Sequence, residues 1–301
     1  MPNNIDLQVL LPGDPAKANP YTICFAANTA LETPWQSFSF SADPMPLNSA
    51  AFDAAVRYSI DCLFGNLPGQ AEQLLSDLRI APFVRIVSLR VTGLAVSDAN
   101  SLVGESPLGQ LLAPRRTQMA AFVNSFGITA DVIFAVSQSS KYTRESAYPT
   151  TDDDTGPGDP FQLDGAARSH RHNFRIPGTV ALHVSSRSLT PLHEFGHAAS
   201  SFTNGQITDL YVDSPPALNC KTGRPIPISF GTLDTLAALS DPTRDGLGYP
   251  PGWRSYHCEL INPSLPAVMD DYINSGNALA CRHDAITRRF LTDRIVAKIN
   301  R

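Results

Sequence analysis

The sequence of 301 residues has no long apolar run and no excess of positive charge. No stretch approaches the roughly 18 uninterrupted apolar residues that mark a membrane-spanning helix, so we expect no such helix. The 23 Lys and Arg residues face 28 Asp and Glu residues, which gives a net charge of −5 and a pI of about 5.8. This balance argues against an extended nucleic-acid surface. Neither a membrane nor a nucleic acid is therefore an expected partner.

Cysteine is scarce, and residues 1–6 carry no recognisable targeting signal. The five cysteines cannot all pair, and their spacing matches no metal ribbon. They are Cys24, Cys62, Cys220, Cys258 and Cys281. A disulfide between Cys258 and Cys281 would suit an oxidising compartment, and buried thiols fit these positions equally well. Because the basic segment and apolar core of a secretory signal are missing, three locations stay open: inside the cell, outside by another route, or outside with a leader removed.

Histidine is scarce too, and two of the seven histidines lie in the pentapeptide His-Glu-Phe-Gly-His at residues 193–197. On an α-helix, His193 and His197 lie one above the other, so both can bind a single metal ion at Zn–N distances of about 2.0–2.1 Å. Glu194 lies about 100° further round the helix. From there its carboxylate can hydrogen-bond a water on the open position of the metal. The pattern predicts the site of a zinc hydrolase.

The residues around the motif predict the helix that it needs. Thr190 followed by Pro191 is a start signal, since a threonine oxygen can cap free N–H groups and proline is tolerated at the first helical position. Asn204-Gly205 is a stop signal. An apolar stripe opposite the histidines comprises Leu192, Phe195, Ala199 and Phe202. Gly196 costs about 1 kcal/mol relative to alanine inside a helix, which suggests that another backbone, such as a sheet strand, passes close to it.

A catalytic zinc needs a third protein ligand besides the two histidines, with water completing the tetrahedron. After the turn at Gly205 the chain can fold back toward the metal. Asp209 is the first candidate, because a carboxylate supplies both an oxygen donor and a negative charge, although a turn or capping role is the ordinary alternative. The other candidates are Asp213, His257 and Glu259. A hydrogen bond to the developing oxyanion could come from Tyr211, Tyr256 or His257.

The run from Leu192 to His197, followed by Asp-x-Tyr at Asp209 and Tyr211, resembles the IgA-peptidase family of zinc metallopeptidases, which is of the zincin type. In that family the active-site helix runs on into a Leu-Ala-Asp-Glu-Tyr segment. The resemblance spans about residues 20–297 and is specific at the zinc motif. The family's aspartate follows its second histidine more closely, whereas Asp209 lies twelve residues after His197. The identity of the third ligand therefore stays open.

This resemblance implies a metallopeptidase that cuts a polypeptide substrate with Zn²⁺ as its cofactor. His193 and His197 would be metal ligands and Glu194 the general base. The chemistry alone gives the same mechanism. Zinc lowers the pKa of a bound water toward about 7 and polarises the scissile carbonyl, while Glu194 takes the proton and passes it to the leaving amine.

Two other functions are compatible with the motif. One is a pseudo-peptidase that keeps the fold and binds protein or glycan without cutting, and retention of Glu194 argues against it because a binding protein needs no general base. The other is a metal-dependent amidase or esterase for small substrates, which a deep and narrow pocket would favour. Substrate identity does not follow from a resemblance in fold.

Two further residues have both a functional and a structural interpretation. Met269, amid apolar neighbours, fits either the methionine floor beneath the zinc of some related peptidases or simple core filling. His183 lies in a strand-like run at residues 179–186, ahead of the motif. In zinc peptidases of this type the strand before the active-site helix often pairs with extended substrate, and an ordinary sheet position is the alternative.

Apolar periodicity predicts an α/β fold, and the resemblance implies that it is of the α+β, zincin-like kind. We expect strands at 7–11, 21–26, 83–91 and 131–136, and helices at 49–64, 70–78, 115–126 and 284–299. Because helices and strands alternate, the sheet should be mixed and partly parallel, with the motif helix packed on it. No repeat, low-complexity segment or linker divides the chain. We therefore expect one domain over residues 1–301, with an N-terminal α/β layer at 1–137 and the catalytic helix, cleft loops and closing helix at 138–301.

Overall fold

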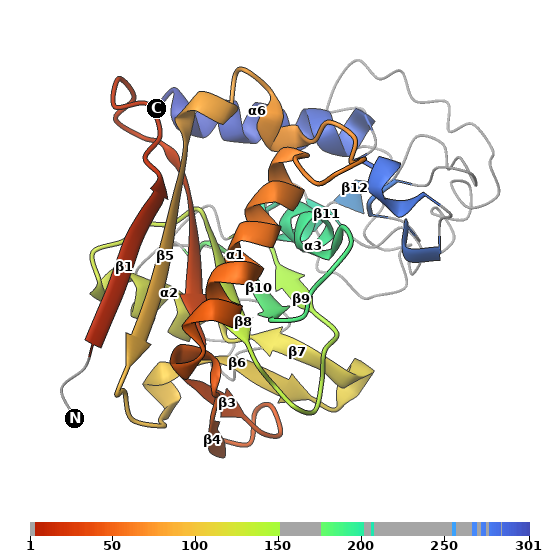
Figure 1. Ribbon diagram of the computed structural model, residues 1–301. Coiled ribbons are helices and arrows are strands. Elements are labelled where there is room, and N and C mark those ends of the chain that lie inside the picture. Colours follow the sequence, from red (N-terminus) through yellow and green to blue (C-terminus); the bar gives the residue numbers. More distant parts are fainter. Residues whose placement is uncertain are drawn as a thin grey trace.

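The computed structural model describes residues 4–150, 176–201, 206–207, 255–256, 267–269, 272–274, 277–283 and 285–301. Within this part of the chain, the protein has an α/β fold built on mixed sheets. The elements of the main sheet and the helices on its two faces can be followed in Figure 1.

The main sheet has six strands in the order β1-β5-β2-β8-β10-β9. They are β1 (Asn4–Leu11), β5 (Val84–Thr92), β2 (Tyr21–Ala27), β8 (Val132–Ser137), β10 (Gly178–His183) and β9 (Ser146–Tyr148). The four inner strands are parallel, and β1 and β9 pair antiparallel at the two ends. Inner strands covered on both faces are expected to be apolar throughout, and every residue of β2 is buried. The prediction of a mixed, partly parallel sheet is confirmed.

A second sheet of four strands lies beside the main one, in the order β4-β3-β6-β7. Its strands are β4 (Phe40–Ala42), β3 (Ala30–Glu32), β6 (Ser101–Ser106) and β7 (Leu111–Pro114). A two-stranded parallel pair joins β11 (Gln206–Ile207) to β12 (Ser255–Tyr256). The sequence did not predict these strands, which are two to six residues long, because such short segments show no clear alternation of apolar and polar positions.

Helix α1 (Ser49–Phe64) has the predicted bounds. The Asn48 side chain accepts a hydrogen bond from the N–H of Ala51, 3.3 Å away, and caps the start. Gly65 ends the helix in the left-handed conformation, with φ of 76°, where glycine is preferred. The predicted helices at 115–126 and 284–299 are α2 (Arg116–Ser125) and α6 (Ala285–Ile299).

The predicted helix at 70–78 is wrong, since this segment contains only a short 3-10 helix at Leu74–Ser76. Leu74 and Leu75 are both buried. The backbone is extended at Gln73 and non-helical at Asp77, which confines the helix to the residues between them. The side-chain amide of Gln73 donates to the carbonyl of Cys281 at 3.0 Å, so a distant segment holds this conformation. The other 3-10 helices of the described chain are Met45–Leu47, Ala81–Phe83, Asp98–Asn100, Leu108–Gln110, Tyr272–Asn274 and Ala278–Ala280.

The two faces of the main sheet carry different cores. Alternation along β2 sends Ile23 and Phe25 into one core with α1, α3 (Thr190–Ala198) and α6, while Cys24 and Ala26 enter another with α2 and the second sheet. Figure 1 shows α1 and α2 on opposite sides of the sheet. The motif helix α3 contacts β10 and β9, which confirms the prediction that it packs on the sheet.

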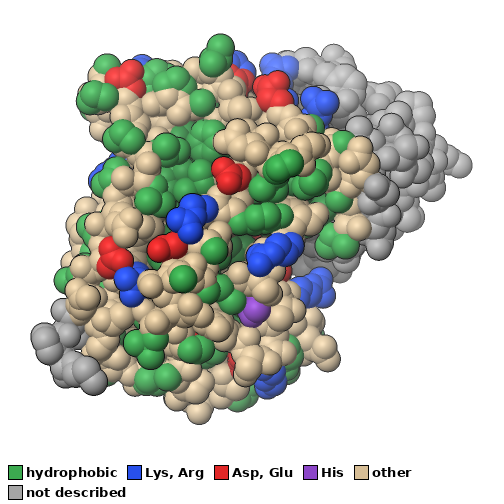
Figure 2. Space-filling view, in the orientation of Figure 1, with side chains coloured by type: hydrophobic (Ala, Val, Ile, Leu, Met, Phe, Trp, Pro, Cys, Tyr) green, Lys and Arg blue, Asp and Glu red, His purple; other side chains and the backbone are tan. Residues whose placement is uncertain are grey.

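The surface of the described chain is chemically mixed on the face seen in Figure 2. Lys and Arg side chains are interspersed there with Asp and Glu side chains, so neither sign dominates this face. Among the described helices, none combines the length and the apolar character that crossing a lipid bilayer requires.

Candidate metal centre

Helix α3 begins where the sequence predicts and ends earlier. Thr190 is its first residue rather than its cap, and the Thr190 hydroxyl lies 3.0 Å from the hydroxyl of Tyr272. The helix ends at Ala198, before the predicted stop at Asn204-Gly205. The Ser200 hydroxyl donates to the carbonyl of His197 at 2.6 Å. Such a local side-chain bond competes with the helical pattern, which explains the early end.

The apolar stripe of α3 packs as predicted where it is described. Leu192, Phe195 and Ala199 are buried, and the ring of Phe195 meets the edge of the Tyr21 ring with centroids 6.4 Å apart. Phe202 lies outside the described residues. The close approach of a strand occurs at Gly178 of β10, where a Cβ atom would collide with the carbonyl of Ala198. Glycine at this position allows helix and sheet to touch.

Gly196 has a different neighbour from the one predicted, and the expectation of a passing strand is wrong. A Cβ atom at Gly196 would lie 2.6 Å from Sδ of Met269 and 2.8 Å from Nε2 of His283. Any larger residue at this position would therefore collide with side chains from a distant segment of the chain. Met269 is fully buried in the hydrophobic core that includes the motif helix, as core filling requires, and its role as a floor beneath a zinc stays a prediction.

The two histidines of the motif converge. Nε2 of His193 and Nε2 of His197 are 3.3 Å apart, and their rings stand at 82° to each other. Two nitrogens bound to one tetrahedral zinc at about 2.0–2.1 Å would themselves be about 3.3 Å apart. The separation of the nitrogens therefore matches that of two ligands of one metal ion.

Each histidine ring is oriented by a backbone carbonyl. Nδ1 of His193 lies 2.7 Å from the oxygen of Val268, and Nδ1 of His197 lies 2.7 Å from the oxygen of Ile207. A carbonyl only accepts, so each Nδ1 must carry the proton. In the neutral rings both Nε2 atoms then present lone pairs, as metal-ligating histidines do.

This arrangement is unfavourable without a cation between the rings. Two lone pairs at 3.3 Å repel each other, and only a shared proton or a metal ion turns the contact into an attraction. Because each Nδ1 already carries a proton, a proton shared between the Nε2 atoms would make one of the rings a charged imidazolium. The donor set and its separation fit Zn²⁺ better.

A third histidine lies beside the pair, although sequence reasoning did not find it. His283 is 3% exposed, and neither of its ring nitrogens has a hydrogen-bond partner in the described structure. Burial, followed by the nearby His193 and His197, lowers the pKa of His283 to about 3. A buried nitrogen without a hydrogen-bond partner costs about 1–3 kcal/mol. His283 is therefore an unsatisfied polar side chain beside the motif.

Two carboxyl groups, those of Glu145 and Glu194, lie near each other at the motif helix. Glu194 is 7% exposed, and Glu145, just before β9, lies close enough to feel its charge. Burial, and then the Glu194 carboxylate, raise the pKa of Glu145 to about 7. Tyr272 is buried near both carboxyls, with its ring centroid 5.6 Å from that of His193. Burial raises the pKa of the Tyr272 phenol, so it stays protonated and can donate a hydrogen bond.

The strand before the motif helix is not available for substrate. β10 is paired by β8 along its length and by β9 over residues 179–181, so the expectation that this strand pairs with extended substrate is wrong for those residues. His183 ends β10, with Nδ1 2.6 Å from the Ser185 hydroxyl and Nε2 3.0 Å from the oxygen of Ser139. Both ring nitrogens of His183 therefore have hydrogen-bond partners, as expected for an ordinary residue of a sheet.

The remaining predicted site residues lie outside the described residues: Asp209, Tyr211, His257, Asp213 and Glu259. Of Tyr256 only the backbone is described, in β12. Cys258 is outside as well, so its pairing with Cys281 stays a prediction. In the described ranges, no group of three His, Cys, Asp or Glu side chains is placed to hold a metal ion. A third ligand is thus still to be identified.

Sequence reasoning missed Glu145, Tyr272 and His283 for different reasons. His283 was one of only seven histidines and lies two residues after Cys281, so histidine scarcity alone could have marked it. Tyr272 follows Met269 by three residues. No local signal distinguishes Glu145, which only the pairing of β9 with β10 brings to the motif helix.

Comparison of the chain with models of known protein families, with curated proteins and with solved structures finds no significant match. The α/β class rests on the structure itself.

Proposed function

We propose that the protein is a zinc-dependent metallopeptidase of the IgA-peptidase type with a zincin-like fold. The observation that carries this proposal is the 3.3 Å separation of the two Nε2 atoms, with both Nδ1 atoms held by carbonyls. His193 and His197 would hold the metal through these lone pairs. The paired carboxyls of Glu145 and Glu194 support the proposal, because a divalent cation offsets their mutual repulsion.

When bound, Zn²⁺ supplies a Lewis acid that polarises a carbonyl and brings the pKa of water to about 7. Glu194 follows His193 on the helix, where its carboxylate accepts a proton from the attacking water and returns it to the leaving amine. Tyr272 keeps its phenolic proton, so it is a described donor for the developing oxyanion, alongside the earlier candidates Tyr211 and His257. The carbonyls of Val268 and Ile207 keep both imidazoles in the binding tautomer.

The test combines metal analysis with proteolysis of unfolded casein. We expect about one zinc per chain and cleavage that chelator abolishes. Glu194→Gln should keep the zinc and lose about 10²–10⁴-fold in rate, the usual contribution of a general base. Glu72→Gln is the matched control, because Glu72 is an exposed carboxylate, 65% accessible and paired with Arg288 away from the motif. It should keep both zinc and activity.

Three outcomes would contradict the proposal in different ways. Protein without stoichiometric zinc after purification with added metal would remove the metal site. Zinc with full activity of Glu194→Gln would remove the assigned base and leave the site. Cleavage of small amides or esters without cleavage of casein would point to the amidase or esterase instead.

A further inference from the structure

The first strand of the main sheet has one edge without a neighbouring strand in the described structure. β1 lies at the end of the strand order and pairs with β5 alone, and its outer backbone groups make no hydrogen bond within the described chain. Figure 1 shows β1 at the margin of the sheet, beside β5. An edge of this kind presents a row of N–H and C=O groups with which another strand can pair.

The same strand carries an apolar stripe. Alternation along β1 places Ile5, Leu7 and Val9 on one face of the sheet, and all three side chains are between 44% and 53% exposed. Opposite them on β5 are three residues that are buried in the core on the α2 face, Val91, Leu89 and Val87. The stripe therefore continues a buried core to the edge of the sheet, where its side chains remain about half exposed.

β1 lacks the features that protect most edge strands, such as Lys, Pro, a short length or a covering segment. It has eight residues without Lys, Arg or Pro, and its single charged side chain, Asp6, pairs with Arg90 of β5 at 2.7 Å. The opposite edge of the sheet is protected. β9 has only three residues and contacts β7, and the Ser146 hydroxyl donates to the carbonyl of Leu112 at 2.6 Å.

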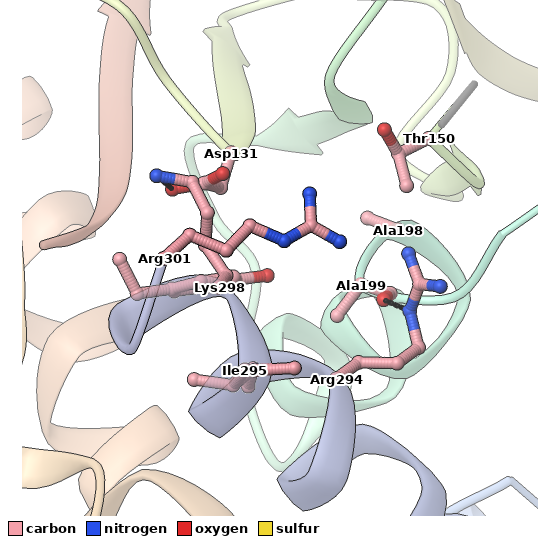
Figure 3. A pocket seen from close by; sticks show the side chains of 10 residues that line it. Asp131, Thr150, Ala198, Ala199, Arg294, Ile295, Lys298 and Arg301 are labelled. Carbon is pink, nitrogen blue, oxygen red and sulfur yellow. Dashed lines mark hydrogen bonds and ion pairs between the residues drawn. The ribbon is translucent and has the colours of Figure 1, made fainter. Parts of the chain in front are cut away.

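The polar groups near α6 also have partners within the chain. Figure 3 shows a cavity of about 190 Å³ between α3 and α6, where Nε of Arg294 donates to the carbonyl of Ala199 at 3.3 Å. Nζ of Lys298 lies 3.8 Å from Oδ2 of Asp131, just before β8. These contacts hold α6 against α3 and the sheet. The outer edge of β1 has no such contacts within the described chain.

We propose that two copies of this chain associate through β1, paired antiparallel about a two-fold axis at Leu7. The main sheet then continues from one copy into the other. A two-fold axis perpendicular to the sheet makes the contact self-complementary and keeps the same face of both copies on one side. Leu7 lies opposite Leu7 of the second copy, and Ile5 lies opposite Val9. The two apolar stripes join into one band, and such cross-strand apolar pairs stabilise a sheet.

Charge and the shape of the strand select this register. Pairing centred on Asp6 would place two carboxylates directly opposite each other, which is destabilising. Pairing centred on Gln8 would place Asp6 opposite Leu10, where the register against β5 shifts and a bulge bends the strand. Pairing centred on Leu7 uses residues 5–9, which precede the bulge. It also brings the Gln8 amide opposite the Asp6 carboxylate, to which this amide donates at 2.9 Å within one copy.

The expected dimer is weak and reversible. Five paired residues at a rise of about 3.4 Å give a contact roughly 17 Å long. One strand from each copy makes a small interface, in the class of transient complexes that bury less than about 1,200 Å². We therefore expect a dissociation constant on the order of 10 µM.

Sedimentation velocity of the full chain tests the association, with chelator present so that the result does not depend on the proposed zinc. Across a concentration series that spans this dissociation constant, we expect a reversible change from monomer to dimer. Leu7→Lys places two ammonium groups opposite each other at the axis and should weaken the dimer about tenfold or more. Leu108→Lys is the matched control, because Leu108 is 83% exposed in the turn between β6 and β7. It should dimerise as the wild type does.

Cysteine variants test the register. Opposed residues of an antiparallel pair have Cα atoms about 4.5–5.5 Å apart, within the range of about 4.4–6.8 Å that a disulfide spans. Mild oxidation should therefore link two copies of Leu7→Cys. In the proposed register the two copies of residue 8 are diagonal neighbours, about 7–8 Å apart, so Gln8→Cys should link much more slowly. The wild type, with its own five cysteines, gives the background.

A chain that stays monomeric throughout the series overturns the proposal, even if it binds an extended peptide instead. A dimer that Leu7→Lys leaves intact, or equal weakening by Leu108→Lys, overturns the placement on β1. Growth beyond the dimer overturns the two-fold arrangement, because a closed contact stops at two copies. Faster linking of Gln8→Cys than of Leu7→Cys overturns the register. Circular dichroism checks folding, and if Leu7→Lys is unfolded, Ile5→Lys at a residue 53% exposed decides.

Discussion

Two clusters of buried polar groups, on opposite faces of the main sheet, differ in how their charges are paired. In the cluster beside the second sheet, the buried guanidinium of Arg115 has Nε 3.1 Å from Oε2 of Glu32 and donates through Nη2 to Asp98 at 2.5 Å. Nearby, Glu105 accepts from the hydroxyls of Thr33 and Ser139. Each of these charges meets a donor or a charge of opposite sign.

Around α3 the groups face others of their own kind. Lone pairs of His193 and His197 point at each other, His283 has no partner for its ring nitrogens in the described structure, and Glu145 faces Glu194. Burying polar groups is tolerated when they are paired and costly when they are not. Opposite charges therefore lie side by side in the first cluster, whereas in the second the proposed zinc would supply the positive charge. Three changes test this contrast.

The largest expected effect is on stability and comes from the complete cluster. Arg115→Met leaves the Glu32 carboxylate, 2% exposed, without its cation. Removing one partner of a buried ion pair costs about 3–5 kcal/mol, so we expect the free energy of unfolding to fall by that amount in urea titrations. Zinc content and cleavage at temperatures where the variant is folded should not change. The double variant Arg115→Met with Glu32→Gln should recover part of the loss, and a double variant as unstable as the single one would contradict the pairing.

A smaller effect is expected at the glycine of the motif helix. Helix propensity alone predicts that Gly196→Ala stabilises the protein by about 1 kcal/mol. The added Cβ would instead press on Met269 and His283, and overpacking typically costs about 1–3 kcal/mol. We therefore expect a lower unfolding temperature and weaker zinc binding. Met269→Ala in the same chain should restore space and reverse much of the loss, while a stabilised Gly196→Ala would show that the segment does not pack as described.

The smallest effect is a pH dependence at Glu145. The folded protein raises the pKa of this carboxyl from 4.5 to about 7, so the folded state holds the proton more tightly than the unfolded state. Its contribution to stability is present below pH 4.5 and is lost as pH rises through about 7. Glu145→Gln cannot ionise, so in chelator it should match wild type at pH 4 and exceed it at pH 8.

We expect a difference of about 1 kcal/mol at pH 8, reduced from the full shift because Glu145 is partly exposed. Thermal unfolding at both values of pH measures it. Glu72→Gln, at an exposed carboxyl, should show no such change with pH. A Glu145→Gln curve parallel to wild type across this range would mean that burial and the Glu194 carboxylate do not raise the pKa of Glu145.

The sequence was sufficient where structure depends on near neighbours. Asn48 and Gly65 mark the ends of α1 on their own, and the four-residue spacing of His193 and His197 places both rings on one side of a helix. The sequence was insufficient where contacts between distant segments determine the structure. The early end of α3 depends on Ser200, whose carbonyl bonds the N–H of Thr150 at 3.1 Å. No spacing of residues in the sequence predicts such a contact.

The neighbours of the histidines show the same limit. Glu145 reaches the site through an edge strand, and Tyr272 and His283 arrive from the far end of the chain. A motif states which groups carry the chemistry. The groups that adjust its charge come from tertiary packing, and only the structure reveals them.

The carbonyl of Val268, which orients His193, also decides when the site can form during synthesis of the chain. It lies 75 residues downstream of the histidine that it holds, and the N–H of Val268 bonds in turn to the carbonyl of Arg282. A ribosome adds about 5–20 residues per second, so the motif is synthesised seconds before the group that aligns it. Under the proposed function, we expect the nascent chain to be inactive as a peptidase during that interval, because no carbonyl yet orients the ring of His193.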